Sequence, residues 1–186
     1  MPEFYEPVPD FVRQAFDKSD NEKIKAQNWA IDQHQLKAKN VYQCISDGMN
    51  VVIDRSPIDV AAYSHYLGLS VYLDSIGNLK KLDWIPGENY FLSATTSEIM
   101  QRFSLRDGLG SLQDSEWTTF FDGLNASYVY YLNLIQSIFP GLAVKVFNTT
   151  QLSINEIVQS VCSSQPNSKD SLNFNFVFEK ISNTYE

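Results

Sequence analysis

Three consecutive β-branched residues, Val51–Ile53, lead into a charged turn and then into a segment that reads PIDVAAYSHYL. An unbroken run of this kind is typical of a short strand that is buried on both faces of a parallel sheet. Asp54, Arg55 and Ser56 follow directly. Ser56 is a suitable N-cap, and Pro57 is favoured in the first turn of a helix. The sequence therefore predicts a buried strand joined to a helix by a turn that carries an acid, a base and a hydroxyl.

This turn is the first candidate site, because ligands of open α/β sheets bind at the carboxyl ends of the strands. A plainer interpretation is that Asp54 and Arg55 form a surface ion pair beside a helix cap, which contributes little to stability. The residues of the turn leave both interpretations open.

Predicted strands and helices alternate along the chain. Further strands are predicted at Asn89–Ala94 and Leu142–Phe147, and a late half-buried strand at Leu172–Phe178, where apolar and polar residues alternate. This order indicates an α/β fold of three layers, in which helices cover both faces of a parallel sheet. We expect one domain at residues 1–163 and a polar C-terminal tail at residues 164–186. The predicted helices are about Asn21–Ser46, Pro57–Ile76, Thr95–Phe103, Glu116–Phe139 and Ile154–Val161.

The charge of the chain limits the classes of partner that we expect it to bind. It has 186 residues, with 14 Lys and Arg against 22 Asp and Glu, a formal net charge of −8. Because no dense basic run occurs, a nucleic-acid polymer is not an expected partner. The sequence has neither a signal-peptide pattern nor an apolar run long enough for a membrane span, so we expect a cytoplasmic protein that does not act in the membrane. Cys44 and Cys162 lack metal-ligand spacing, and we expect reduced thiols in the core.

Several motifs occur in the order in which one group of enzymes has them. Glu6-Pro7 lies near the start, Asp54–Ser56 ends the β-branched run, and Arg102 and Arg106 lie one turn apart in a later predicted helix. With these motifs, residues 4–161 resemble the P-loop nucleoside and nucleotide kinases, most closely deoxynucleoside kinases and the thymidylate kinase-like group. The run Asp54–Tyr63 also resembles a neighbouring group of small ATPase-kinases.

The resemblance implies phosphoryl transfer from ATP, with Mg²⁺, to a (deoxy)nucleoside or a nucleoside monophosphate. It implies that Glu6 is the catalytic base, that Asp54 helps to hold Mg²⁺, and that Arg55 is catalytic and reaches the reacting oxygens. Arg102 and Arg106 match the lid arginines that close on the phosphates in this family.

Substrate recognition is implied on the opposite side of the site. A glutamine of the long helix reads the base in this family, and the spacing does not decide between Gln27 and Gln33. Tyr63 is assigned to the substrate side by the same resemblance. The family also implies a homodimer that forms through the long helices.

The sequence departs from the family at its phosphate-binding loop. Catalytic members carry G-x-x-x-x-G-K-[ST] after the first strand, and these 186 residues contain no such motif. The expected fold therefore lacks its first strand–helix unit, and the chain alone is expected to be inactive. Three interpretations follow: a kinase whose loop lies outside this chain, a non-catalytic nucleotide-kinase-like binding or interaction module, or an unrelated α/β protein.

Overall fold

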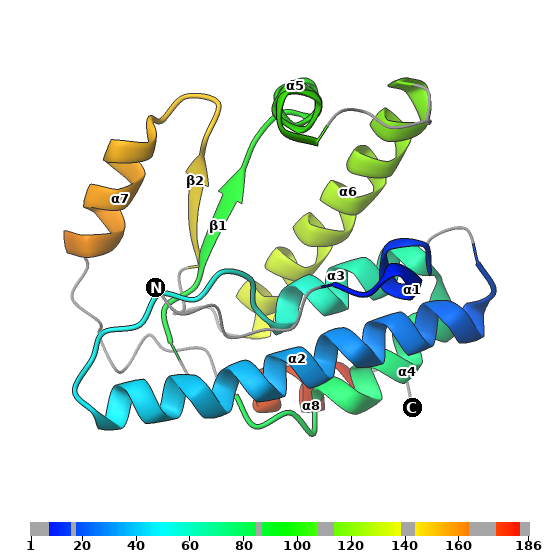
Figure 1. Ribbon diagram of the computed structural model, residues 1–186, viewed down its shortest axis with the longest axis horizontal. Helices are drawn as coiled ribbons and strands as arrows, with labels where there is room; N and C mark the ends of the chain where they lie inside the picture. Colours follow the sequence, from blue (N-terminus) through cyan, green and yellow to red (C-terminus); the bar gives the residue numbers. More distant parts are fainter. Residues whose placement is uncertain are drawn as a thin grey trace. The chain divides into compact units, whose positions relative to one another are not determined.

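The computed structural model describes residues 8–15, 18–84, 87–107, 114–138, 144–163 and 174–182 (Figure 1). Most of these residues lie in helices. They form two compact units. The first contains the described residues among 1–86 and 173–186, and the second contains those among 87–172. No helix in the described part of the chain is long and apolar enough to cross a membrane.

The first unit is helical. It contains α1 (Asp10–Arg13), α2 (Asp20–Ser46), α3 (Pro57–Leu67), α4 (Leu69–Leu79) and α8 (Phe174–Ser182). Helix α4 is central to its packing, because it contacts α2, α3 and α8. The side chains at its centre are almost completely buried: Val71, Tyr72, Ile76 and Leu79 on α4, and Phe174, Val177, Phe178 and Ile181 on α8.

Two local signals place the helices of this unit. The start of α2 is fixed by Ser19, whose backbone N–H and hydroxyl both donate to the Glu22 carboxylate, at 3.1 and 2.8 Å. With the Glu22 backbone facing the Ser19 side chain in return, the bond from the Ser19 N–H to the Glu22 carboxylate forms a capping box. The single helix predicted from Pro57 to Ile76 is instead split into α3 and α4 at Gly68. Gly68 has φ 122°, a backbone conformation that residues with a side chain rarely adopt.

The second unit contains a small sheet and three helices. Strands β1 (Tyr90–Ser93) and β2 (Lys145–Asn148) pair in parallel, with Tyr90 opposite Lys145 and Ser93 opposite Asn148. The helices are α5 (Thr96–Asp107), α6 (Asp114–Ile138) and α7 (Ile154–Ser163) (Figure 1).

Aromatic rings hold the second unit together. Phe103 of α5 packs against Trp117 and Phe121 of α6, with ring centroids 4.8 and 5.8 Å apart. Phe91 of β1 contacts Tyr128 of α6 at 5.3 Å. By contrast, α7 contains no buried residue.

The predicted three-layer α/β fold is wrong. The described residues contain one sheet, and it has two strands. Asn50–Ile53 is extended but belongs to no strand. A β-branched run forms a strand only where a second extended segment pairs with its N–H and C=O groups. No described residue pairs with these groups, so the sequence signal produces an extended segment and no central strand.

The predicted strand at Leu172–Phe178 is also wrong, because Phe174 begins helix α8. The helices predicted from Asn21, Thr95, Glu116 and Ile154 are confirmed to within a few residues by α2, α5, α6 and α7. The strand predicted at Asn89–Ala94 is confirmed by β1, and the one at Leu142–Phe147 by β2 from Lys145 onward. The division into a domain at 1–163 and a tail remains a prediction.

Candidate functional site

The turn Asp54–Ser56 joins the extended segment to α3 and carries the predicted acid, base and hydroxyl. The Ser56 hydroxyl accepts a hydrogen bond from the Ile58 backbone N–H at 3.3 Å, and the Asp59 carboxylate accepts one from the Ser56 N–H at 2.6 Å. Pro57 occupies the first turn of α3. The predicted N-cap is confirmed, and the Asp59 carboxylate is part of the cap because it accepts the Ser56 N–H.

Arg55 has an unusual backbone conformation. Its φ is 66°, and within the described ranges it is the one residue other than glycine with positive φ. The left-handed conformation costs a residue with a side chain roughly 1–2 kcal/mol. One contact holds the turn in place: Lys37 Nζ donates to the Asp54 carbonyl oxygen at 2.8 Å. The Arg55 side chain lies close enough to Tyr63 to oppose the rise that burial causes in the pKa of its hydroxyl. Backbone strain of this kind concentrates at functional sites.

Lys37 reaches the turn from the buried face of α2. The residue is 7% exposed. Burial lowers the pKa of its ammonium group, and the charges of Asp54 and Asp59 oppose that shift, while Arg55 adds to it. Lys37 and Arg55 therefore place two cationic groups beside two carboxylates.

His34 lies one turn before Lys37 on the same face of α2. It is 6% exposed, and its Nδ1 has no hydrogen-bond partner among the described residues. Its ring packs edge-on against Trp84, with the centroids 5.2 Å apart. Burial, with the nearby charges of Lys37 and Arg55, lowers the pKa of His34 to about 3. The imidazole is therefore neutral at pH 7.

Tyr63 lies on α3, two turns after the N-cap. Burial raises the pKa of its hydroxyl, the charge of Asp59 raises it further, and the charge and hydrogen bond of Arg55 lower it. The guanidinium of Arg55 in the turn thus lies near an ammonium and an imidazole from α2 and a phenol from α3. Lys37 and Arg55 are groups that bind phosphate oxygens.

The turn offers a metal ion one suitable carboxylate, that of Asp54. Asp54 is exposed, and its carboxylate accepts no hydrogen bond from any residue that the structure describes. No group of three or more His, Cys, Asp or Glu side chains that could hold a metal occurs in the described ranges. One carboxylate suits Mg²⁺ only where phosphate oxygens complete its coordination. Mg²⁺ therefore fits this turn only as a complex with a phosphate ligand.

The two predicted base-reading glutamines lie on α2. Gln27 is buried, and its side-chain oxygen accepts a hydrogen bond from the Ser64 hydroxyl of α3 at 3.2 Å. Gln33 is half-buried. The side-chain carbonyl of Gln27 thus links α2 to α3 through a hydrogen bond. Base recognition by Gln27 or Gln33 stays a prediction.

The other predicted residues lie outside the described part of the first unit. Glu6 lies outside the described residues. Arg102 and Arg106 lie on α5, in the second unit. Arg102 donates to Glu98 Oε1 at 2.8 Å and to Thr149 Oγ1 and carbonyl oxygen at 2.9 and 2.8 Å. These contacts tie α5 to the end of β2, and the lid role stays a prediction.

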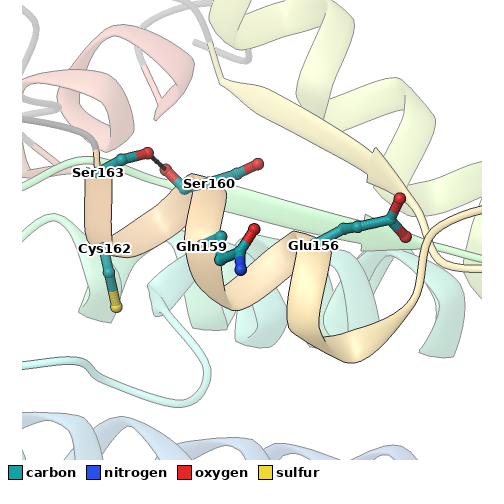
Figure 2. A pocket seen from close by; sticks show the side chains of 5 residues that line it. All are labelled: Glu156, Gln159, Ser160, Cys162 and Ser163. Carbon is teal, nitrogen blue, oxygen red and sulfur yellow. Dashed lines mark hydrogen bonds between the residues drawn. The ribbon is translucent and has the colours of Figure 1, made fainter.

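A hollow beside α7 is a weaker candidate. Figure 2 shows its lining side chains spread along one helix, with the Ser163 hydroxyl bonded to the Ser160 carbonyl. All five lining residues are exposed, and the Glu156 carboxylate is held by the N–H and hydroxyl of Ser153, each at 2.7 Å. No polar group is buried there, and Cys162 is exposed, which contradicts the expected core position.

Sequence reasoning missed His34 and Lys37. A signal for them existed, because the buried residues of α2 recur at helical spacing: Ala26, Gln27, Ile31, His34, Lys37, Ala38 and Val41. Polar residues at core spacing on a helix indicate a buried polar cluster.

Comparison with known proteins adds no further guide: no family model, curated protein or solved structure matches this chain.

Proposed function

We propose that this chain is a nucleotide-kinase-like binding module. It binds the phosphate end of a nucleoside or nucleotide ligand at the Asp54–Ser56 turn and transfers no phosphoryl group by itself. The observation that carries the proposal is the strained, left-handed Arg55 beside the buried Lys37, because a strained backbone that positions two cations is of use to an anionic ligand.

The ligand would meet groups of different chemistry at this turn. Lys37 Nζ donates one hydrogen bond to the Asp54 carbonyl, and an ammonium group carries three N–H donors in all. The Arg55 guanidinium, on an exposed residue, offers paired N–H donors of the kind that bind phosphate. The Tyr63 hydroxyl lies near Arg55, whose charge opposes the rise that burial causes in the pKa of that hydroxyl.

The first test is a coupled kinase assay with ATP, Mg²⁺ and a panel of nucleosides and nucleoside monophosphates. We expect turnover far below about 1 per second, the low end of kinase rates. The reason is that these 186 residues lack the loop whose backbone N–H groups stabilise the transferring phosphoryl group. Turnover at or above that rate would contradict the inactive module and favour catalysis through another phosphate cradle.

The second candidate function is phosphoryl transfer from ATP, with Mg²⁺, in partnership with a phosphate-binding loop outside this chain. The exposed Asp54 carboxylate favours it, since that group accepts no hydrogen bond from the described residues and would hold Mg²⁺ together with phosphate oxygens. Glu6 would act as base and Arg102 and Arg106 as lid cations. An in-frame G-x-x-x-x-G-K-[ST] in the DNA upstream of the Met1 codon would support this candidate.

Substitution of Arg55 separates binding from stability. Arg55→Gly should weaken the binding of ATP or of a nucleoside monophosphate at least about tenfold, because a charge-assisted hydrogen bond is worth about 1.5–3 kcal/mol. The free energy of unfolding should stay within about 1 kcal/mol, because glycine relieves the left-handed strain while the side-chain contacts of an exposed residue are lost. Calorimetric titration beside a thermal melt measures both quantities.

The matched control is Lys39→Ala, which removes an exposed cation of α2. It should change neither binding nor stability beyond experimental error. If Arg55→Gly and Lys39→Ala bind equally well, or if the wild-type chain binds no nucleotide at millimolar concentration, Arg55 is a structural residue and the proposal fails.

The proposal extends to cellular location and assembly. We place the protein in the cytoplasm, and we propose that it forms a homodimer through its long helices. In support of the dimer, α2 exposes three large apolar side chains, Leu36, Tyr42 and Ile45, which are 40–47% exposed.

A further inference from the structure

The segment Asn50–Ile53 is extended and has no pairing partner. Its backbone N–H and C=O groups make no hydrogen bond with any residue that the structure describes. An extended run of unpaired groups is a template for pairing with another extended chain. Val52 in its centre is 78% exposed, far more than is usual for a β-branched side chain.

This segment continues an apolar surface at the end of α2. The Met49 N–H donates to the Cys44 carbonyl at 3.0 Å, which keeps the start of the segment against the last turn of the helix. Ile45 and Met49 are 47% and 50% exposed. The unpaired backbone therefore lies beside apolar side chains that a partner would also cover.

We infer that Asn50–Asp54 pairs in antiparallel register with the same segment of a second copy of this chain, with Val52 opposite Val52 of the partner subunit. A two-fold axis at Val52 is consistent with the commonest symmetry of soluble oligomers, in which each subunit uses the same surface. The inference deepens the proposed function, because it rests on the homodimer proposed there and adds a contact next to the end of α2 to the one through the long helices.

Polar complementarity favours a second copy as the occupant. In this register Asn50 lies opposite Asp54 of the partner subunit, and Asp54 lies opposite the partner's Asn50. Both residues are exposed, and neither side chain has a hydrogen-bond partner among the described residues. An amide donor facing a carboxylate acceptor on both sides of the axis satisfies four groups that one chain leaves unpaired.

The pairing would also add a residue to the proposed binding site. Asp54 belongs to the turn that carries Arg55, so the partner's Asn50 would lie at the edge of that turn. Its amide would hold the Asp54 carboxylate in place for a ligand. Each of the two sites in the dimer would then consist of residues from both subunits.

The test is the oligomeric state of the purified full chain without nucleotide, measured by sedimentation and light scattering. At about 100 µM, far above a micromolar dissociation constant, we expect the mass of two chains. Val52→Asp should weaken association at least about tenfold, because two carboxylates would lie directly opposite each other. Ile154→Asp is the control, since Ile154 is also 78% exposed but lies on α7 in the other unit.

A second pair of variants tests the register and does not depend on Val52→Asp folding. Asn50→Asp should also weaken association about tenfold, because it places two carboxylates opposite each other. The double variant Asn50→Asp with Asp54→Asn exchanges the two groups and should restore the wild-type dissociation constant. Circular dichroism and thermal melts check that each variant is folded.

Three results would overturn the inference. A monomer at about 100 µM removes the dimer but leaves nucleotide binding, which calorimetry measures separately. A dimer unaffected by Asn50→Asp places the interface elsewhere. A dimer weakened by Asn50→Asp and not restored by the double variant excludes this register.

Discussion

Acidification from pH 7.5 to pH 5 should lower the free energy of unfolding by about 2 kcal/mol through His34 alone, and by about 4 kcal/mol at pH 3. The pKa of His34 is lowered to about 3 in the folded protein, from an ordinary value of 6.5. Between pH 3 and pH 6.5, His34 is mostly protonated in the unfolded chain and mostly neutral in the folded chain. Stability is therefore fully present above about pH 6.5 and is lost progressively as the pH falls toward 3.

The cause of this loss is the position of the imidazole. His34 is 6% exposed, its Nδ1 has no partner in the described structure, and Lys37 and Arg55 lie near it. A further positive charge there is neither hydrated nor paired. The window from pH 6.5 to pH 5 is the most informative, because below it carboxylates such as Glu22 and Glu156 also gain protons.

His34→Leu should remove the slope in that window, and the other histidine provides the control. His65 is exposed, unlike His34, although burial lowers its pKa as well. We therefore expect His65→Asn to keep most of the wild-type slope. Urea denaturation at half-unit pH intervals measures the effect, and the imidazole resonances give the pKa of each histidine. A flat profile for the wild type, or an unchanged slope in His34→Leu, would contradict the assignment.

Phe178→Ala should destabilise the first unit by about 3–5 kcal/mol, the usual loss for a phenylalanine removed from a core. Phe178 is 1% exposed and stacks on Phe174, whose ring in turn lies 6.4 Å from Trp84. The apolar residues of α8 recur at positions 174, 177, 178 and 181, which is one face of a helix, and all four are buried.

Lys180→Ala is the matched control on the same helix, because Lys180 is exposed and alanine preserves helix propensity. Its effect should stay within about 0.5 kcal/mol. Urea unfolding followed by tryptophan fluorescence compares the two variants. A loss below about 1 kcal/mol for Phe178→Ala would mean that α8 is not part of the core.

The same residues explain why the C-terminal segment was predicted wrongly. Leu172, Phe174, Phe176 and Phe178 alternate with other residues, as in a strand, while Phe174, Val177, Phe178 and Ile181 follow helical spacing. Both periods are present in one sequence. The helix buries Val177 and Ile181 as well, in a helix α8 that contacts α4. It also satisfies its own backbone groups, which a strand without a partner does not.

Local signals predicted the caps and the ends of most helices, because a cap depends on residues three positions apart. Ser56 and Asp59 are an example, and Ser153 with Glu156 is another. The central strand was not predictable in this way, since Val51–Ile53 needs a distant extended segment to become one. Asp54 and Arg55 could be singled out from their motif, whereas Lys37 joins them only through the packing of α2 on the turn.

The first unit is built from two separate parts of the sequence, and this affects how it folds during synthesis. Its core combines α2–α4 with α8, which is separated from them in the sequence by the whole second unit. During synthesis, α4 emerges from the ribosome long before Phe174 and Phe178 exist to cover it. The second unit has all its described elements available earlier and can fold first. We therefore expect ribosome-bound chains that end before residue 174 to leave α4 open to chaperones and proteases, with the first unit closing only after residues 174–182 have emerged.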